Sequence, residues 1–120
     1  MKRREIVEIL KSTGIPITYY QWDEDKDGDG PALPYIVYYY PSSEGEAADD
    51  RQWSQKSRLN VELYTETKDF DMEARVDAVL GSFCVFDKEE TYLSDEHMYE
   101  VLYMTEVLIN EQNSVWCKES

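Results

Sequence analysis

The residues with the clearest spacing for chemistry are three aspartates in the acidic run Asp-Glu-Asp-Lys-Asp-Gly-Asp-Gly. Asp23, Asp25 and Asp27 take positions one, three and five of a calcium loop. Gly28 takes position six, where the loop must turn sharply. Position twelve, however, is Pro34 instead of a bidentate Glu. The favoured interpretation is therefore a solvated acidic turn between two strands, and calcium binding is the alternative.

Other residue types that carry catalysis are scarce. His97 is the single histidine, and a surface position just before a predicted strand is expected for it. The sequence contains no nucleophile-elbow pattern, no glycine-rich phosphate loop and no Cys-x-x-Cys motif. Carboxylates are abundant, but no pair stands out on opposing apolar elements, where their pKa values would be driven apart. The sequence therefore predicts a protein without catalytic residues or a cofactor.

The net charge of −14, from 26 acidic and 12 basic residues, is the strongest compositional feature. Binding to phosphate backbones needs clustered Lys and Arg, so the composition argues against ordinary and sequence-specific nucleic-acid binding. Solubility and self-repulsion are the simplest roles for such a charge. Two sharper hypotheses remain: the surface imitates nucleic acid, or it must not adhere to it.

The length of 120 residues suits one domain, predicted over 1–109, followed by a loosely ordered tail over 110–120. No apolar run approaches the roughly 20 residues of a membrane helix. The basic N-terminal stretch lacks the apolar region of a signal peptide. Cys84 lies in an apolar run, which predicts a buried, reduced thiol in a cytoplasmic protein.

The tyrosine-rich stretch 35–40 is expected to organise the sheet, because β-branched and aromatic residues favour strands. A strand that is apolar on both faces is central in a covered sheet or buried against a neighbouring subunit. Its two faces carry three side chains each: Ile36, Tyr38 and Tyr40 on one, and Tyr35, Val37 and Tyr39 on the other. The candidate interface residues are Tyr35, Tyr38, Tyr39, Tyr40 and Trp53.

Hydrophobic periodicity predicts an α+β fold, in which two helices pack on one face of an antiparallel or mixed sheet. The helices are expected over 2–13 and 69–80, the second capped by Asp69. The alternation over 59–63 predicts an antiparallel hairpin with the tyrosine strand. Further strands are expected over 15–22, from residue 53 into this alternation, over 83–86, 91–93 and 98–109, with a projecting loop over 42–51 and a turn over 87–90.

Two acidic loops are predicted, one before the tyrosine strand and one at the tip of the hairpin. The first carries Asp23, Glu24, Asp25, Asp27 and Asp29. The second carries Glu44, Glu46, Asp49 and Asp50.

Four runs, LPYIVYYYP, RLNVELYTETKD, EARVDAVL and MYEVLYMTEVLI, follow a short N-terminal helix. In this order they resemble tail-completion or tail-terminator proteins of long-tailed phages and Gram-positive prophages, related in fold to the lambda tail terminator. The resemblance covers roughly residues 1–109. It implies an α+β subunit without catalytic residues that forms a ring, commonly a hexamer. Such a ring caps the tail tube and meets the head connector, first in the host cytoplasm and then in the virion.

If DNA passes through such a ring, carboxylates near its path avoid gripping the phosphates. We therefore expect at least one acidic loop to face the channel or the tail tube; the alternative is that both loops lie outside and keep the protein soluble. Two other functions stay open at this point. One is an acidic DNA mimic that inhibits a nuclease or repressor, and the other is a small calcium-responsive binding module.

Overall fold

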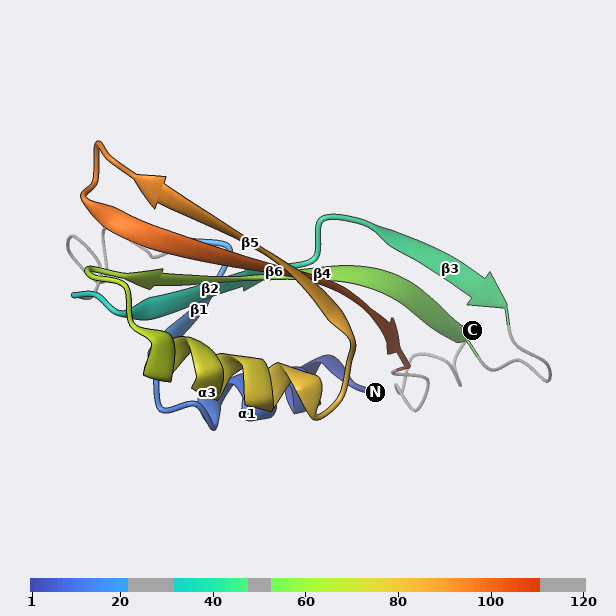
Figure 1. Cartoon of the computed structure of the whole chain (residues 1–120). Coiled ribbons are helices and arrows are strands. Elements are labelled where there is room, and N and C mark those ends of the chain that lie inside the picture. Colours follow the sequence, from blue (N-terminus) through green and yellow to red (C-terminus); the bar gives the residue numbers. More distant parts are fainter. Residues whose placement is uncertain (22–31, 48–52, 111–120) are drawn as a thin grey trace.

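The computed structural model describes residues 1–21, 32–47 and 53–110. These residues form one mixed sheet with two helices on one face, which confirms the predicted α+β class (Figure 1). In chain order the elements are α1 (Arg3–Lys11), β1 (Ile17–Tyr19), β2 (Tyr35–Tyr39), β3 (Ser43–Ala47), β4 (Trp53–Thr65), α3 (Phe70–Gly81), β5 (Phe86–Leu93) and β6 (Met98–Ile109).

The strands of this six-stranded sheet lie in the order β1-β2-β4-β6-β5, and β3 also pairs with β4. β1 runs parallel to β2, whereas the other pairings are antiparallel. The predicted antiparallel pairing of the tyrosine strand with the 59–63 alternation is confirmed, with Tyr38 opposite Val61. The longest pairing joins β4 to β6 and places Val61 opposite Tyr103.

Both helices begin and end where local chemistry favours it. The backbone N–H of Lys2 donates to the Glu5 carboxylate at 2.6 Å before α1, and Gly14 follows α1 with φ +80°, which suits glycine. The Asp69 carboxylate accepts from the Met72 N–H at 3.0 Å and caps α3, as predicted. Among the described residues, neither helix is long and apolar enough to cross a membrane.

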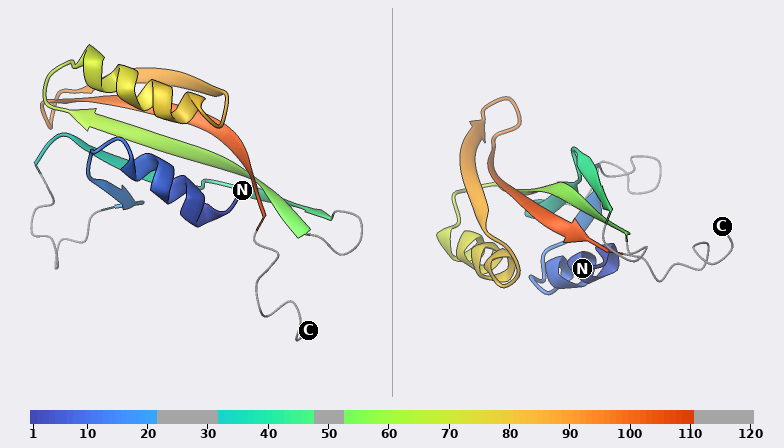
Figure 2. Two further views of the ribbon diagram at one scale, coloured as in Figure 1. Left: turned by 90° about the horizontal axis from the view of Figure 1, so that it is seen from below. Right: turned by 90° about the vertical axis from the view of Figure 1, so that its right-hand side faces the viewer.

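The core lies between these helices and one face of the sheet. Seen from the helix side in Figure 2, α3 lies over β5 and β6, and α1 lies toward β1 and β2. The fully buried aliphatic side chains of the core come from both helices, β2 and β4: Ile6, Leu10, Val76, Leu80, Ile36, Leu59, Val61 and Leu63. One sheet face therefore carries nearly all of the core.

Two predictions about the first half of the chain are wrong. The strand expected over 15–22 is limited to β1, because the backbone of Tyr20 turns to φ +70°. The projecting loop expected over 42–51 contains β3, which pairs with the first part of β4. Since β4 has 13 residues and β2 only five, β4 offers a free edge to the polar segment that follows β2.

A third error concerns the segment after α3. Two short strands were expected over 83–86 and 91–93, separated by a charged turn over 87–90. The structure has one continuous strand, β5, paired with β6 from Phe86 to Leu93. The charges do not break this strand because they alternate between its faces, and Lys88 and Glu90 reach ion-pair partners on the helix side.

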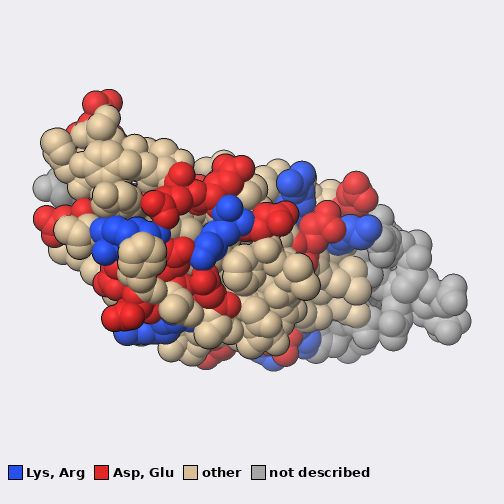
Figure 3. All heavy atoms as spheres, viewed as in Figure 1, with Lys and Arg blue, Asp and Glu red and all other residues tan. Residues whose placement is uncertain are grey.

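These ion pairs form a cluster that joins the start of α3 to β5. Lys68 pairs with Glu73 and Glu90, and Lys88 pairs with Glu73 and, at 3.0 Å, with Asp77. Figure 3 shows acidic and basic side chains interleaved on this side of the molecule. Glu73 is the centre of the cluster and is 9% exposed.

The ion-pair cluster changes the pKa of its central carboxylate, Glu73. Burial raises the pKa of Glu73, but hydrogen bonds and charges from Lys68 and Lys88 outweigh burial and lower the pKa below its usual value. A lowered pKa in the folded state stabilises the protein above the ordinary Glu pKa, and this stabilisation is lost as the pH falls through the folded-state value.

We expect Val61→Asp to unfold the domain or nearly so. Val61 is fully buried; burial of a valine stabilises by about 1.5–3 kcal/mol, and an unpaired carboxylate there adds a desolvation cost. Val85→Asp is the matched control, because Val85 is 92% exposed and should melt close to wild type. Thermal melts followed by circular dichroism measure both variants. A wild-type melt for Val61→Asp would show that the strand register is wrong.

Glu73→Gln should lower the free energy of unfolding at pH 7 by about 1.5–3 kcal/mol, the range for hydrogen bonds to charged groups. The deficit should shrink as the pH falls below the ordinary Glu pKa, because the wild-type carboxylate then becomes protonated. Urea unfolding at several pH values measures this difference. Glu89→Gln, an exposed change on the other face of β5, is the control and should show no such pH dependence.

Candidate protein-interaction surface

The sheet face opposite the two helices, here called the open face, carries more apolar side chains than a solvated face needs. The odd-numbered side chains of β6, such as Val101 and Tyr103, enter the core, so the even-numbered ones point to the open face. These are Met98, Glu100, Leu102, Met104, Glu106 and Leu108. An antiparallel sheet with one wet face normally alternates apolar and polar residues. Four apolar side chains of six therefore indicate a contact surface.

Leu108 illustrates this exposure, since half of its surface remains accessible. The sequence analysis did not single out Leu102, Met104 or Leu108, because apolar residues at both even and odd positions of this run obscure any alternation. The signal was present in the composition of β6. A strand apolar on both faces, in a sheet whose helices cover only one face, leaves one set on the uncovered face, where Leu102 and Met104 are half-buried and Leu108 is exposed.

Polar side chains at the other end of the open face form a hydrogen-bonded network. The Tyr64 hydroxyl lies 2.7 Å from Glu62 Oε1 and 3.1 Å from Glu100 Oε2. The Tyr39 hydroxyl donates to Glu62 Oε2 at 2.9 Å and accepts from Asn60 Nδ2 at 3.3 Å. Strand pairing thus brings together two carboxylates that the sequence analysis did not connect, although the polar positions of the 59–63 alternation lie on this face.

Crowding in the network raises the pKa of one carboxyl group. Burial is the main cause for Glu100, the hydrogen bond from Tyr64 opposes it, and the nearby charge of Glu62 raises the pKa further. Burial also raises the pKa of Tyr64. The Tyr64 hydroxyl bridges carboxylates of β4 and β6, and Tyr39 adds β2, so the network links side chains of three strands.

The side chains of the tyrosine strand lie on both faces of the sheet, as predicted. Tyr38 is 8% exposed and packs against the helices, and Tyr40 is half-buried beside it, with their ring centroids 6.5 Å apart. On the open face Tyr35 packs against Tyr64 at 5.3 Å, and the half-buried Tyr39 joins the polar network. The candidate interface residues therefore do not form one surface.

Two tyrosines that the sequence analysis did not select are more exposed. Tyr19 and Tyr20 are 50% and 64% exposed. Their rings extend the clusters on both faces, with Tyr19 at 5.3 Å from Tyr38 and Tyr20 at 5.2 Å from Tyr39. The signal available in the sequence was the position of these two tyrosines just before the acidic run. A strand that ends there leaves the side chains of its last residues without a neighbouring strand.

The remaining candidate residues are divided by the limits of the described chain. Glu44 is exposed on β3, opposite Lys56. Glu46 also belongs to β3, and Trp53 begins β4. The prediction that Glu44 and Glu46 lie at the tip of a loop is therefore wrong. The other acidic-loop residues, including the calcium candidates, lie outside the described residues: Asp23, Glu24, Asp25, Asp27, Asp29, Asp49 and Asp50.

His97 is exposed in the turn between β5 and β6, where it adopts φ +55°, so its expected surface position is confirmed. Cys84 is half-buried as a free thiol, and its Sγ donates to the Leu80 carbonyl at 3.3 Å. Burial raises the pKa of Cys84, which disfavours the reactive thiolate. Within the described ranges, no three His, Cys, Asp or Glu side chains are placed to hold a metal ion.

The chain matches no protein-family model and no curated protein sequence.

Glu100→Gln should raise the melting temperature at pH 7. A raised pKa in the folded state means that the charged form destabilises the fold, and this cost disappears as the pH falls below the ordinary Glu pKa. The advantage of Glu100→Gln over wild type should therefore shrink toward pH 4. Glu106→Gln, an exposed change on the same face of β6, is the control. A variant that is less stable than wild type at pH 7 would contradict the assignment.

Proposed function

We propose that this chain is a structural subunit of the head–tail region of a long-tailed phage or prophage. In this role it is a tail-terminator or tail-completion protein that forms a ring on the tail tube and meets the head. The observation that carries the proposal is the apolar open face of β6. An assembly subunit must keep such a face available until its partner arrives, and a solitary protein has no use for it.

Two further features support an assembly role. The α+β architecture, with two helices on one sheet face, is the one that the sequence resemblance implies. The polar network of Glu62, Tyr64 and Glu100 holds side chains of the open face in one arrangement. A surface that is rigid before binding loses less conformational entropy when its partner docks.

The charge distribution favours this role over a DNA mimic. A mimic needs a contiguous acidic face, whereas Lys68 and Lys88 stand among the carboxylates over α3 and β5 (Figure 3). The net charge of −14 then serves a ring that DNA traverses without being held. Exposed carboxylates such as Glu44 would suit the channel, where screening at physiological salt limits their effect to about 8 Å.

We expect Leu102→Arg to disrupt assembly without unfolding the chain. Leu102 lies on the open face between Glu62 and Glu89, so the new cation gains nearby carboxylates while it removes the apolar contact. In a phage that depends on this protein, the variant should produce tails of abnormal length or tails without heads. Electron microscopy of the particles measures both properties.

Phe70→Arg is the matched control, because Phe70 is 73% exposed at the start of α3, away from the open face. It should give normal particles. Circular dichroism establishes that both variants are folded. Normal tail length and head joining for a folded Leu102→Arg protein would refute the use of the open face, and no tail defect on deleting the gene would refute the proposed function.

A further inference from the structure

β6 carries apolar side chains toward both faces of the sheet, but the two helices cover only one face (Figure 2). Its odd-numbered side chains, such as Tyr103, are buried on the helix side. On the open face, Leu102 and Met104 are half-buried at successive positions, and Leu108 is exposed. Strands that are apolar on both faces are typical of sheets with helices on both sides. The open face of β6 therefore has the composition of a surface that a further helix covers.

Carboxylates border these apolar side chains on both neighbouring strands. Strand pairing places Leu102 between Glu62 of β4 and Glu89 of β5. Met104 lies opposite Asp87 of β5. Residues that pair directly across two strands point to the same side of a sheet, so these carboxylates stand on the open face. The apolar surface is thus one strand wide and has an acidic border on each side.

The border carboxylates lack the lysine partners that the helix side provides. On the helix side, Glu73 pairs with two lysines. On the open face, Asp87 and Glu89 are exposed, and neither forms an ion pair with any described residue. Burial raises the pKa of Glu100, and the nearby charge of Glu62 raises this pKa further. A positive charge from a partner would therefore be stabilised on this face.

The separation of the two borders fits an α-helix. β4 and β5 lie on either side of β6. Neighbouring strands are about 4.8 Å apart, so the two borders are about 10 Å apart. An α-helix with its side chains is about 10–12 Å wide. A helix that lies along β6 therefore places its apolar residues on Leu102 and Met104 and its flanking residues over both borders.

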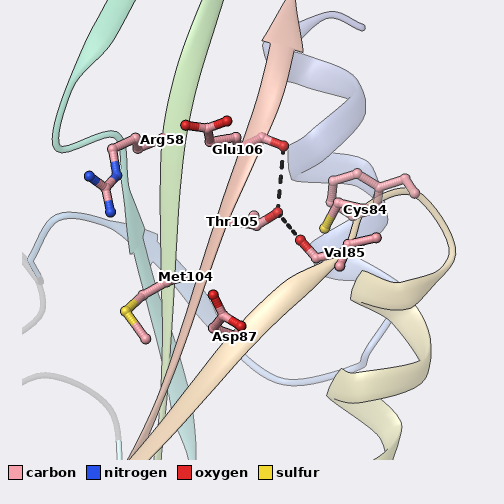
Figure 4. A pocket seen from close by; sticks show the side chains of 8 residues that line it. Arg58, Cys84, Val85, Asp87, Met104, Thr105 and Glu106 are labelled. Carbon is pink, nitrogen blue, oxygen red and sulfur yellow. Dashed lines mark hydrogen bonds between the residues drawn. The ribbon is translucent and has the colours of Figure 1, made fainter.

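A hollow of about 680 Å³ adjoins this apolar surface at Met104. Its lining includes Asp87, Met104 and Glu106, and Arg58 lies opposite Glu106 in the sheet (Figure 4). The volume is within the range of ligand-binding pockets, so a side chain of a partner has room beside Met104. Arg58 is the basic residue of this lining, so the acidic borders are strongest around Leu102 and Met104.

We propose that the open face binds an amphipathic α-helix of a protein partner, whose apolar side lies along β6 and whose flanks carry Lys or Arg. The apolar side contacts Leu102 and Met104. The basic flanks face Glu62 on one border and Asp87 and Glu89 on the other. In recognition of this kind, apolar anchors supply affinity and charges supply orientation and specificity.

The proposal rests on the use of the open face in the proposed function and adds the chemistry of the partner. A second copy of this chain is disfavoured as the occupant, because it also carries a net charge of −14. Like charges on the two surfaces would repel each other.

The test uses the full chain and the peptide acetyl-Lys-Leu-Ala-Lys-Leu-Leu-Lys-Ala-Leu-Lys-Lys-Leu-Ala-Lys-amide. Its leucines occupy one side of a helix, and its lysines occupy the flanks and the other side. Amide chemical shifts followed by NMR should change saturably at Leu102, at Met104 and at their neighbours on β4 and β5, with half-saturation below about 1 mM. A peptide of the same composition, with its leucines spread around the helix, keeps the charge and loses the apolar side. It should bind at least about tenfold more weakly.

Variants of the chain locate the charge contacts. Asp87→Asn and Glu89→Gln should each weaken binding about two- to fivefold, and this effect should shrink at high salt. Glu8→Gln is the matched control, because it removes one exposed carboxylate from α1 on the other side of the sheet. It should bind the peptide as wild type does. The control separates the acidic borders from the net charge of the chain.

Absence of saturable binding, shifts centred away from β6, or equal binding of the two peptides would overturn the proposal. Equal weakening by Glu8→Gln and Glu89→Gln would also overturn it, because general charge attraction would then explain the binding. Shifts at Leu102 on concentrating the chain without peptide would identify a second copy as the occupant instead. The peptide experiment needs only the isolated chain, so its failure leaves the phage role to the tail-length measurement, and failure of that role leaves peptide binding intact.

Discussion

The antiparallel pairing of β4 with β6 extends from Gln55–Ile109 to Thr65–Tyr99, and every other part of the sheet takes its place from it. β2 and β3 pair with successive parts of β4, and β5 pairs with β6. Strand side chains alternate with a period of two, so a slip of one residue in this register would exchange the faces. Val61 and Tyr103 would then leave the core together.

The two faces of this strand pair are stabilised by different interactions. The helix face is closed by aliphatic packing and, at its margin, by the ion pairs around Glu73. The open face combines an apolar stripe on β6 with hydrogen bonds among Tyr39, Tyr64 and the carboxylates of Glu62 and Glu100. At Glu73 the pairing with two lysines outweighs the cost of burying the charge, whereas at Glu100 burial and a nearby carboxylate both disfavour the charge.

The sheet edges follow from the same arrangement. β1 is an edge strand of three residues, and β5 places charges such as Lys88 and Glu89 along the other edge. Short strands and charged side chains both discourage pairing between sheets. Beyond the start of β5, Met1 bonds to the end of the β6 edge.

The amino-acid sequence by itself determined the α+β class, the two helices with their core stripes, the strand at 98–109 and the pairing of the tyrosine strand with the 59–63 alternation. The helices and strands among these features depend on local periodicity and capping, as at Asp69, whereas the strand pairing joins residues as far apart as Tyr38 and Val61. The polar segment 43–47 became a strand only because β4 outlasts β2 and offers it an edge. Likewise, the charged segment of β5 forms a strand because its backbone pairs with β6 and its Lys88 forms an ion pair with Glu73 of α3. The open face and the Glu62–Glu100 network were decided by tertiary structure alone. The network joins Tyr64 to Glu100, 36 positions apart in the chain, and the open face depends on which sheet face the helices cover.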